Sequence, residues 1–170
     1  MTAYAAPNTG NYYVGKGRVY FKPSGDTEFR HMGNCTSMAL TTEIEELDHF
    51  SQQSGVRTKD KTIVLEKSAT LSVVLDEWNA DNLRLALLGT ITEQSGGDKE
   101  IEIFDVNSIA GELKFDGDNE VGPKQFVHLF NVSFKPGGEL QLIGDDWGLI
   151  ELEGDVLTNS ESRFGIWTVV

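Results

Sequence analysis

The stretch between residues 35 and 89 constrains the fold more than any other part of the chain. Residues 35–45 alternate between apolar and polar side chains, and a second strand-like run starts at Lys59 and ends at Leu75. Successive side chains of a strand point to opposite faces, so both runs predict strands. The predicted apolar face of the first strand consists of Met38, Leu40, Thr42 and Ile44.

A long polar segment, Glu46–Thr58, separates these two runs. Hairpin loops usually have roughly 2 to 5 residues, and much longer loops are commonly functional. We therefore expect a hairpin with a long loop that reaches for a neighbouring molecule.

A single helix is predicted directly after the second run, within residues 78–89. Asn79 is a suitable N-cap residue, and Gly89 suits the position just beyond the C-terminal end. Leu83, Ala86 and Leu87 would form the apolar side of this helix.

The rest of the chain predicts further short strands separated by turns. Phe126, His128, Phe130, Val132 and Phe134 alternate in one of them and predict an inward face. Such a pattern is typical of a mainly β fold, an antiparallel β-sandwich or barrel with one short flanking α-helix. We expect residues 1–14 to form an N-terminal arm and residues 15–170 to form one domain. The expected strands cover 18–22, 100–105, 111–115, 125–134, 139–143, 147–157 and 165–170.

Composition excludes several classes of partner. The formal net charge is −13, with no basic cluster, which disfavours ordinary binding to nucleic acid or to an anionic membrane. Cys35 is the only cysteine, so an intrachain disulfide is impossible and a structural zinc site is not expected. We expect no export signal, because residues 1–13 have neither the basic residues nor the apolar core of one. We expect no membrane-inserted segment, because no apolar run is long enough to span a bilayer.

The sequence gives little support to an enzyme or to a cofactor site. His31, His49 and His128 are scattered, without metal-ligand spacing, and we interpret His128 as a core histidine. The acidic stretch 116–120 fails the spacing of a helix-flanked calcium loop, so a solvated turn is the better interpretation. No catalytic residue, metal or cofactor is therefore predicted.

Acidic residues recur at alternate positions on three predicted strands. One group is Glu43 and Glu45, and another is Glu100 and Glu102. Each pair would lie on one strand face, either as an ordinary solvated surface or as part of a shared anionic surface. The third group is Glu151, Glu153 and Asp155.

The order of these elements resembles a known protein family. A strand at 17–21, a Gly33-Asn34 turn and a strand ending in 43–49 are followed by a Ser-rich loop with Gly55-Val-Arg57 and a helix ending at Gly89. This order is similar to the major tail tube protein of long, flexible-tailed bacteriophages (siphophages), among them the Chi-like group. The resemblance covers residues 15–89, and the second half agrees in pattern only.

The resemblance implies a structural virion protein that self-assembles. It implies hexameric rings stacked head to tail around a tape-measure protein, with tail terminator and tip proteins at the ends. The hollow tube would let double-stranded DNA pass without specific binding during genome ejection, through an acidic lumen. Its location would be the virion tail, after synthesis in the host cytoplasm.

The resemblance also assigns roles to particular residues. The loop would join successive rings through His49, Phe50, Gln52, Gln53 and Arg57. Glu43 and Glu45 are the expected lumen acids, whereas the side on which Glu151, Glu153 and Asp155 lie stays open.

Two alternatives remain at this point. The inner tube of a contractile injection or secretion system would share the same architecture. A monomeric receptor- or carbohydrate-binding β-module would instead use an aromatic groove, with Trp78, Trp147 and Trp167 as the residues to examine.

Overall fold

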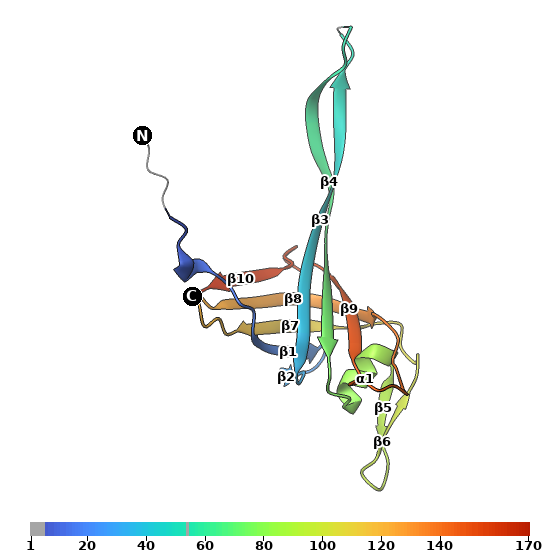
Figure 1. Ribbon diagram of the computed structural model, residues 1–170. Helices are drawn as coiled ribbons and strands as arrows, with labels where there is room; N and C mark the ends of the chain where they lie inside the picture. The colour runs from blue at the N-terminus through green and yellow to red at the C-terminus, as the bar shows by residue number, and fades with distance from the viewer. Residues whose placement is uncertain (1–5, 54) are drawn as a thin grey trace.

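Two long strands dominate the computed structural model, which describes residues 6–53 and 55–170. Strand β3 (Cys35–Ser51) and strand β4 (Thr58–Leu75) pair antiparallel over their whole length and project far beyond the rest of the molecule (Figure 1). The predicted long loop is therefore wrong. Residues 46–51 continue β3, and the strands are joined by only a short segment, residues 52–57.

The remaining elements are short. They are the 3-10 helix η1 (Thr9–Asn11), the helix α1 (Ala80–Leu87) and the strands β1 (Gly17–Pro23), β2 (Arg30–His31), β5 (Thr90–Glu93), β6 (Lys99–Glu102), β7 (Ile109–Gly117), β8 (Gln125–Pro136), β9 (Ile150–Val156) and β10 (Gly165–Val169).

One antiparallel sheet runs in the order β2-β1-β7-β8-β9-β4-β3, with β10 also paired to β8. It folds over at β8, because the first half of β8 pairs with β10 and its second half pairs with β9. Two layers result, and Figure 1 shows β3 and β4 crossing over β1, β7, β8 and β10 at a steep angle. The predicted mainly β, antiparallel sandwich with one flanking helix is confirmed.

The core lies between these two layers. Phe21 of β1 and Phe134 of β8 meet edge to face at 5.0 Å between ring centroids, and both are buried. The second layer contributes alternate residues of β4 and β9, and α1 closes one end with Leu85 and Ala86. The buried residues of β4 and β9 are Leu71, Val73, Leu75, Ile150, Leu152 and Val156.

The inward face of β8 differs from the prediction. Val127 and Leu129 are buried, and so are Val132 and Phe134, because an irregularity in the pairing with β7 shifts the alternation between Leu129 and Val132. His128 consequently lies on the outer face, where its Nε2 is 2.9 Å from Glu112 Oε2. It is not a core histidine.

The helix is capped as predicted at its start and differently at its end. Asn79 accepts a hydrogen bond from the Asn82 amide, but the left-handed residue at the other end is Leu88, with φ 46°, rather than Gly89. Gly89 is required for another reason, since a side chain there would collide with the backbone of Glu102. The buried side of the helix contains Asn82, Leu85 and Ala86. Of the predicted apolar residues, Ala86 is therefore confirmed, Leu83 is partly buried against the core, and Leu87 is half-buried.

Several predicted strands change. Residues 139–143 form no strand and lie in the loop between β8 and β9, and the strand expected at 147–157 begins only at Ile150, as β9. The expected strand at 100–105 is only β6, which forms a separate hairpin with the unpredicted β5. The strands expected near the two ends of the domain are confirmed as β1 and β10.

Candidate assembly surfaces

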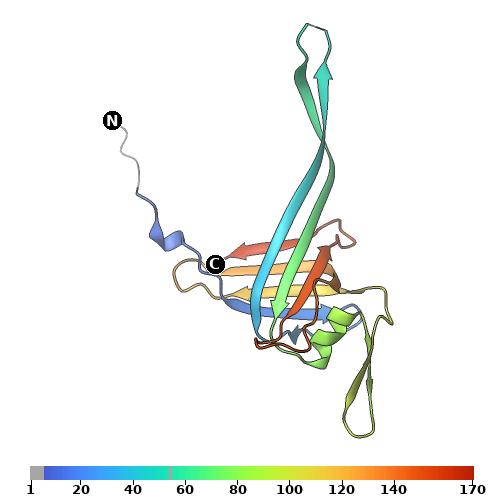
Figure 2. The ribbon, with the colours of Figure 1, turned by 45° about the vertical axis from the view of Figure 1, so that its right-hand side comes forward.

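The β3–β4 hairpin has an inner part that covers the core and an outer part that stands alone. Residues 41–50 of β3 and 58–67 of β4 are all exposed, whereas Leu71, Val73 and Leu75 are fully buried. At roughly 3.3 Å per residue, the outer part is about 30 Å long. We call residues 41–67 the hairpin arm; both views show it projecting from the sheet (Figures 1 and 2).

The hairpin arm exposes large apolar side chains. Leu47 lies directly opposite Ile63, and these side chains are 54% and 45% exposed. Contiguous apolar surface of this kind marks an interaction site more often than a free surface. The exposed apolar residues of the arm are Ile44, Leu47, Phe50, Val56, Ile63, Val64 and Leu65.

A polar network holds the outer end of the hairpin arm together. Asp48 accepts hydrogen bonds from Lys59 Nζ at 2.7 Å and from Thr62 Oγ1 at 2.8 Å. The hydrogen bond from Lys59, followed by that from Thr62, lowers the pKa of the Asp48 carboxyl. His49 Nδ1 lies 2.6 Å from Asp60 Oδ1. These cross-strand contacts fix the register where no core is present.

The structure brings together some of the residues predicted to join neighbouring copies. The Arg57 guanidinium lies over the Phe50 ring at 5.5 Å, so these two form one unit at the end of the hairpin arm. Gln52 and Gln53 are exposed in the connecting segment beside them, and Ser54 lies outside the described residues. His49 instead faces Asp60 within the arm.

The strand register gathers the acidic residues on one face. Glu43 is opposite Ser68, Thr70 is opposite Asp155, and Ser72 is opposite Glu153. Directly opposite residues of an antiparallel pair share a face. The acids predicted on β3 and β9 therefore lie on the same outward face, which we call the acidic face. Its members are Glu43, Glu45, Glu66, Glu151, Glu153 and Asp155.

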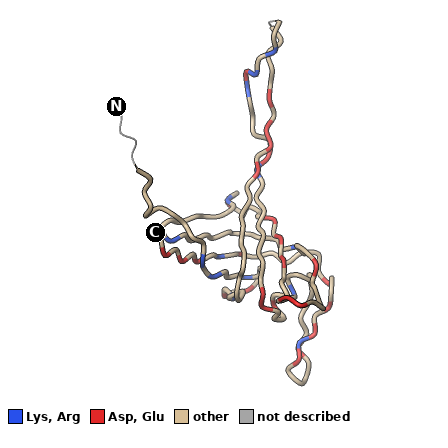
Figure 3. Tube along the Cα trace, viewed as in Figure 1, with Lys and Arg blue, Asp and Glu red and all other residues tan. Residues whose placement is uncertain are grey.

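Like charges meet directly within the acidic face. Glu45 lies opposite Glu66, a pairing that destabilises an isolated sheet. Lys135 of β8 lies at the edge of this face and donates to Asp155 Oδ1 at 3.0 Å, which raises the pKa of Lys135. Figure 3 shows acidic residues along the hairpin arm and along β9.

Asn119 anchors the N-terminal segment and was not recognised in the sequence. Its Oδ1 accepts from the Val14 and Val121 amides at 3.2 and 3.3 Å, and its Nδ2 donates to the Tyr12 and Pro123 carbonyls at 2.9 and 3.1 Å. All four hydrogen-bonding positions of the amide are therefore used. The stretch expected to be a solvated turn holds the arm at residues 12–14, and residues 1–5 of that arm lie outside the described residues.

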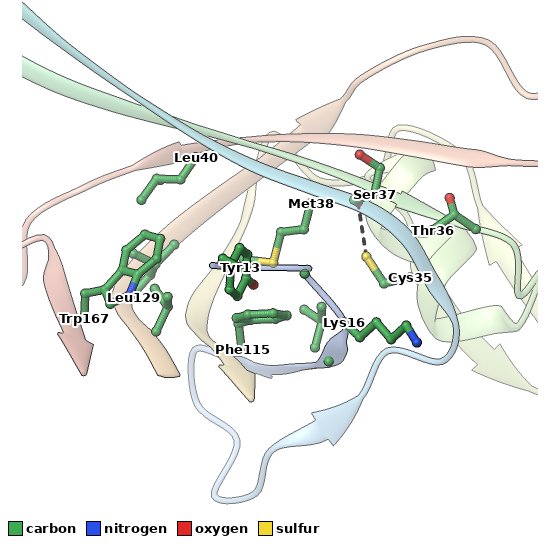
Figure 4. A pocket seen from close by; sticks show the side chains of 14 residues that line it. Tyr13, Lys16, Cys35, Thr36, Ser37, Met38, Leu40, Phe115, Leu129 and Trp167 are labelled. Carbon is green, nitrogen blue, oxygen red and sulfur yellow. Dashed lines mark hydrogen bonds between the residues drawn. The ribbon is translucent and has the colours of Figure 1, made fainter. Parts of the chain in front are cut away.

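A groove opens between the two layers at the end of the sandwich near the N-terminal segment. It has a volume of about 350 Å³ and is shown in Figure 4. Trp167 on its wall is 58% exposed, and its Nε1 donates to Gln125 Oε1 at 2.7 Å. The apolar side chains in the groove are Val19, Met38, Leu40, Phe115, Val127, Leu129 and Trp167.

Within residues 6–53 and 55–170, no three His, Cys, Asp or Glu side chains lie close enough together to hold a metal ion. In the same residues, no helix has both the length and the apolar character needed to cross a bilayer.

The fold and these surfaces define an antiparallel β-sandwich protein with a projecting two-stranded arm. Residues 12–113 and 94–165 match the family described as "Protein of unknown function UCP028589", and the chain belongs to this family. No curated protein matches the chain. Among solved structures, it is similar to a chain from the tail of an empty GTA particle with C6 symmetry. The identity is 12%, 91% of this chain and 95% of that chain are covered, and the TM-score is 0.45.

Proposed function

We propose that this chain is the repeating structural subunit of a tube: the major tail tube protein of a long, flexible-tailed bacteriophage. The observation that carries the proposal is the hairpin arm, whose apolar side chains are exposed over a length of about 30 Å. A two-stranded hairpin alone is at best marginally stable in water. Packing against the next copy would cover these side chains and stabilise the arm.

Contact through a projecting arm favours open-ended growth. The tip of the arm and the surface that receives it would differ, so the interface is head to tail and does not close on itself. In this proposal, six copies form a ring and the arms join successive rings. His49, Phe50, Gln52, Gln53 and Arg57 lie at or near the end of the arm and would make these contacts. Residues 15–170 form the repeating unit, and residues 1–14 form an arm that contacts a neighbour.

The acidic face supports a role as the inner wall of the tube. Glu43 and Glu45 share this face with Glu151, Glu153 and Asp155, so five of the proposed acids would face the lumen together. A cationic wall would bind phosphates and retain DNA, whereas an anionic wall leaves a hydrated gap around it. Double-stranded DNA would pass without specific binding.

The remaining partners follow from the same role. A tape-measure protein would occupy the lumen before genome passage, and terminator and tip proteins would cover the two ends of the tube. The protein would be made in the host cytoplasm and would function in the virion tail. The proposal requires no catalytic residue, cofactor, metal or membrane insertion.

Shortening the hairpin arm tests this function. Replacing residues 52–57 by Asn-Gly joins Ser51 to Thr58 through a two-residue turn that suits paired strands. We expect an unchanged circular dichroism spectrum, since the core contains none of these residues, and loss of large assemblies in sedimentation velocity. Assemblies of normal size from the shortened chain would refute the role of the arm.

The inner tube of a contractile injection or secretion system is the same proposal in another machine. A sheath protein encoded beside this chain would favour it.

A monomeric carbohydrate- or receptor-binding module is the second candidate. One observation favours it: Trp78 and Trp147 line the same surface pocket, and Trp147 is 93% exposed. This alternative predicts a monomer at every concentration.

A further inference from the structure

The loop between β8 and β9 exposes its largest apolar side chains almost completely. Trp147, Ile143 and Leu142 are 93%, 92% and 83% exposed, the highest values among the exposed large hydrophobic residues of the described chain. We call residues 139–149 the apolar loop. Three such side chains within six residues form an apolar patch that a partner can cover.

The apolar loop is held in place by contacts at both of its ends. Leu140 packs against the core, and the Gly137 amide donates to the Glu151 carbonyl at 3.1 Å. Gly148 lies against the Trp78 indole so closely that a Cβ there would come within 2.9 Å of the ring. These contacts fix the two ends of the loop, and Trp147, next to Gly148, is exposed to solvent.

The apolar loop is acidic, whereas the end of the hairpin arm is weakly basic. The loop contains Glu139, Asp145 and Asp146, and the chain has no Lys or Arg between residues 136 and 162. The end of the arm, residues 48–61, carries Arg57, Lys59 and Lys61 against Asp48 and Asp60, a net charge of +1, beside the exposed side chains of Phe50 and Val56. Asp76 also lines the pocket beside Trp147, which adds to the negative charge.

The two surfaces also point in opposite directions. Both views place the end of the hairpin arm at one end of the molecule and the loop between β8 and β9 near α1, at the other end (Figures 1 and 2). One chain therefore presents a weakly basic tip with exposed apolar side chains at one end and an acidic loop with exposed apolar side chains at the other.

We propose that the apolar loop is the docking surface for the hairpin arm of a second copy of this chain. This proposal rests on the proposed tube function and adds the receiving surface that the function requires. Trp147 and Ile143 pack against the Phe50–Arg57 unit, and Asp145 and Asp146 face Arg57 and Lys61. A buried tryptophan at the centre of such a contact is a common energetic hot spot.

Directed cross-linking tests the contact in a Cys35→Ser background. One variant carries Gln53→Cys at the arm and the other carries Ile143→Cys at the apolar loop. On brief oxidation, the equimolar mixture is expected to give at least tenfold more heterodimer than either variant gives homodimer. The matched control replaces Ile143→Cys by Ser160→Cys, another exposed position, and should stay at background. Equal cross-linking at Ser160 and Ile143 would overturn the proposal.

A mixing experiment separates this proposal from the tube function itself. Trp147→Ala and the shortened-arm variant should each fail to assemble alone, with at least a tenfold rise in the concentration required. Mixed together, they retain one intact arm and one intact loop and should form small complexes. Normal assembly of Trp147→Ala, with failure of the shortened arm, would overturn the loop as receptor but keep the tube function. Normal assembly of both variants would refute both proposals. A wild-type chain that stays monomeric and binds a glycan, with that binding lost in Trp147→Ala, would refute the docking proposal and favour the carbohydrate-binding alternative.

Discussion

At the residue scale, single buried amides fix segments that the strands do not hold. Asn119 is 5% exposed and joins residues 12–14 to the turn after β7 through four hydrogen bonds. Asn82 is fully buried and acts similarly, since its Nδ2 donates to the Met32 and Glu77 carbonyls and its Oδ1 accepts from Arg30. Burial is the main cause that lowers the pKa of this arginine.

Replacing Asn119 tests the anchor. Asn119→Ala leaves two amides and two carbonyls without their partner, and each unsatisfied buried group costs about 1–3 kcal/mol. Because some of these groups can reach water, we expect a loss of roughly 2–4 kcal/mol in the free energy of unfolding, measured by urea denaturation. Asn107→Ala, at an exposed site, is the control and should change it by less than about 0.5 kcal/mol. Equal effects of the two substitutions would contradict the assigned anchor.

Glu112 predicts how stability depends on pH. Lys22 Nζ lies 2.5 Å from its Oε1, and this hydrogen bond, with a further one from His128, lowers the pKa of the carboxyl below its ordinary value of 4.5. A lowered folded pKa means that the ionised form stabilises the fold above pH 4.5, and this stabilisation is lost as pH falls through the folded pKa.

The corresponding experiment compares melting temperatures of the wild type and Glu112→Gln between about pH 5 and about pH 3. The wild type should lose more thermal stability on acidification than the variant. Glu28→Gln, at an exposed site, should follow the wild type. Identical acid sensitivity of Glu112→Gln and the wild type would show that this carboxylate does not contribute.

At the scale of elements, the alternation of apolar and polar residues predicted the strands that cover the core well, because the core imposes this alternation. Residues 38–40 and 71–75 alternate as expected, and β9 has its acids outward and its apolar residues inward. Alternation failed where no core imposes it. Residues 46–51 have no buried face yet form a strand, since cross-strand contacts such as Asp48–Lys59 replace burial. Pairing irregularity in β8 reversed the predicted face of Phe126 to Phe130, and a sequence gives no local signal for such a shift.

The candidate surfaces were anticipated only in part. The predicted contact residues lie at or near the end of the hairpin arm, and Ser51 is the last residue of β3 rather than part of a loop. The common face of Glu43 and Glu153 depends on the pairing of β3, β4 and β9, which links residues far apart in sequence. The apolar loop was missed because Leu140, Leu142 and Trp147 resemble the apolar residues of two strands.

The hairpin arm should show low local stability in the free chain. Its backbone hydrogen bonds are exposed to solvent and no buried side chains support them, in contrast to residues 69–75. Amide hydrogen exchange should therefore be faster in residues 43–66 than in 69–75. Assembly should slow the exchange of the arm by more than tenfold. Equal protection of both segments in the monomer would contradict the marginal stability assigned to the arm.

At the scale of the whole molecule, net charge and shape act together. The charge of −13 is unevenly distributed, with an acidic face on β3, β4 and β9 and basic residues near the end of the hairpin arm. Such a distribution allows copies to attract one another end to end while repelling DNA from the proposed inner wall.

Charge reversal on the acidic face tests the inner wall. Glu43→Lys with Glu45→Lys should still permit tubes to form, but these tubes should retain double-stranded DNA at low salt and release it as salt increases. The control reverses Glu93 and Glu100 on the separate β5–β6 hairpin and should retain no DNA. DNA binding that is equal in all three proteins would count against the acidic face as the lumen.

The most direct test of the central claim is negative-stain electron microscopy of the purified chain over a range of concentrations, with its mass in solution measured in parallel. The account predicts hollow rings or tubes at high concentration, and a mass that falls to that of one chain on dilution. The account would be contradicted by a chain that remains monomeric at every concentration and whose arm amides exchange at the same rate at every concentration.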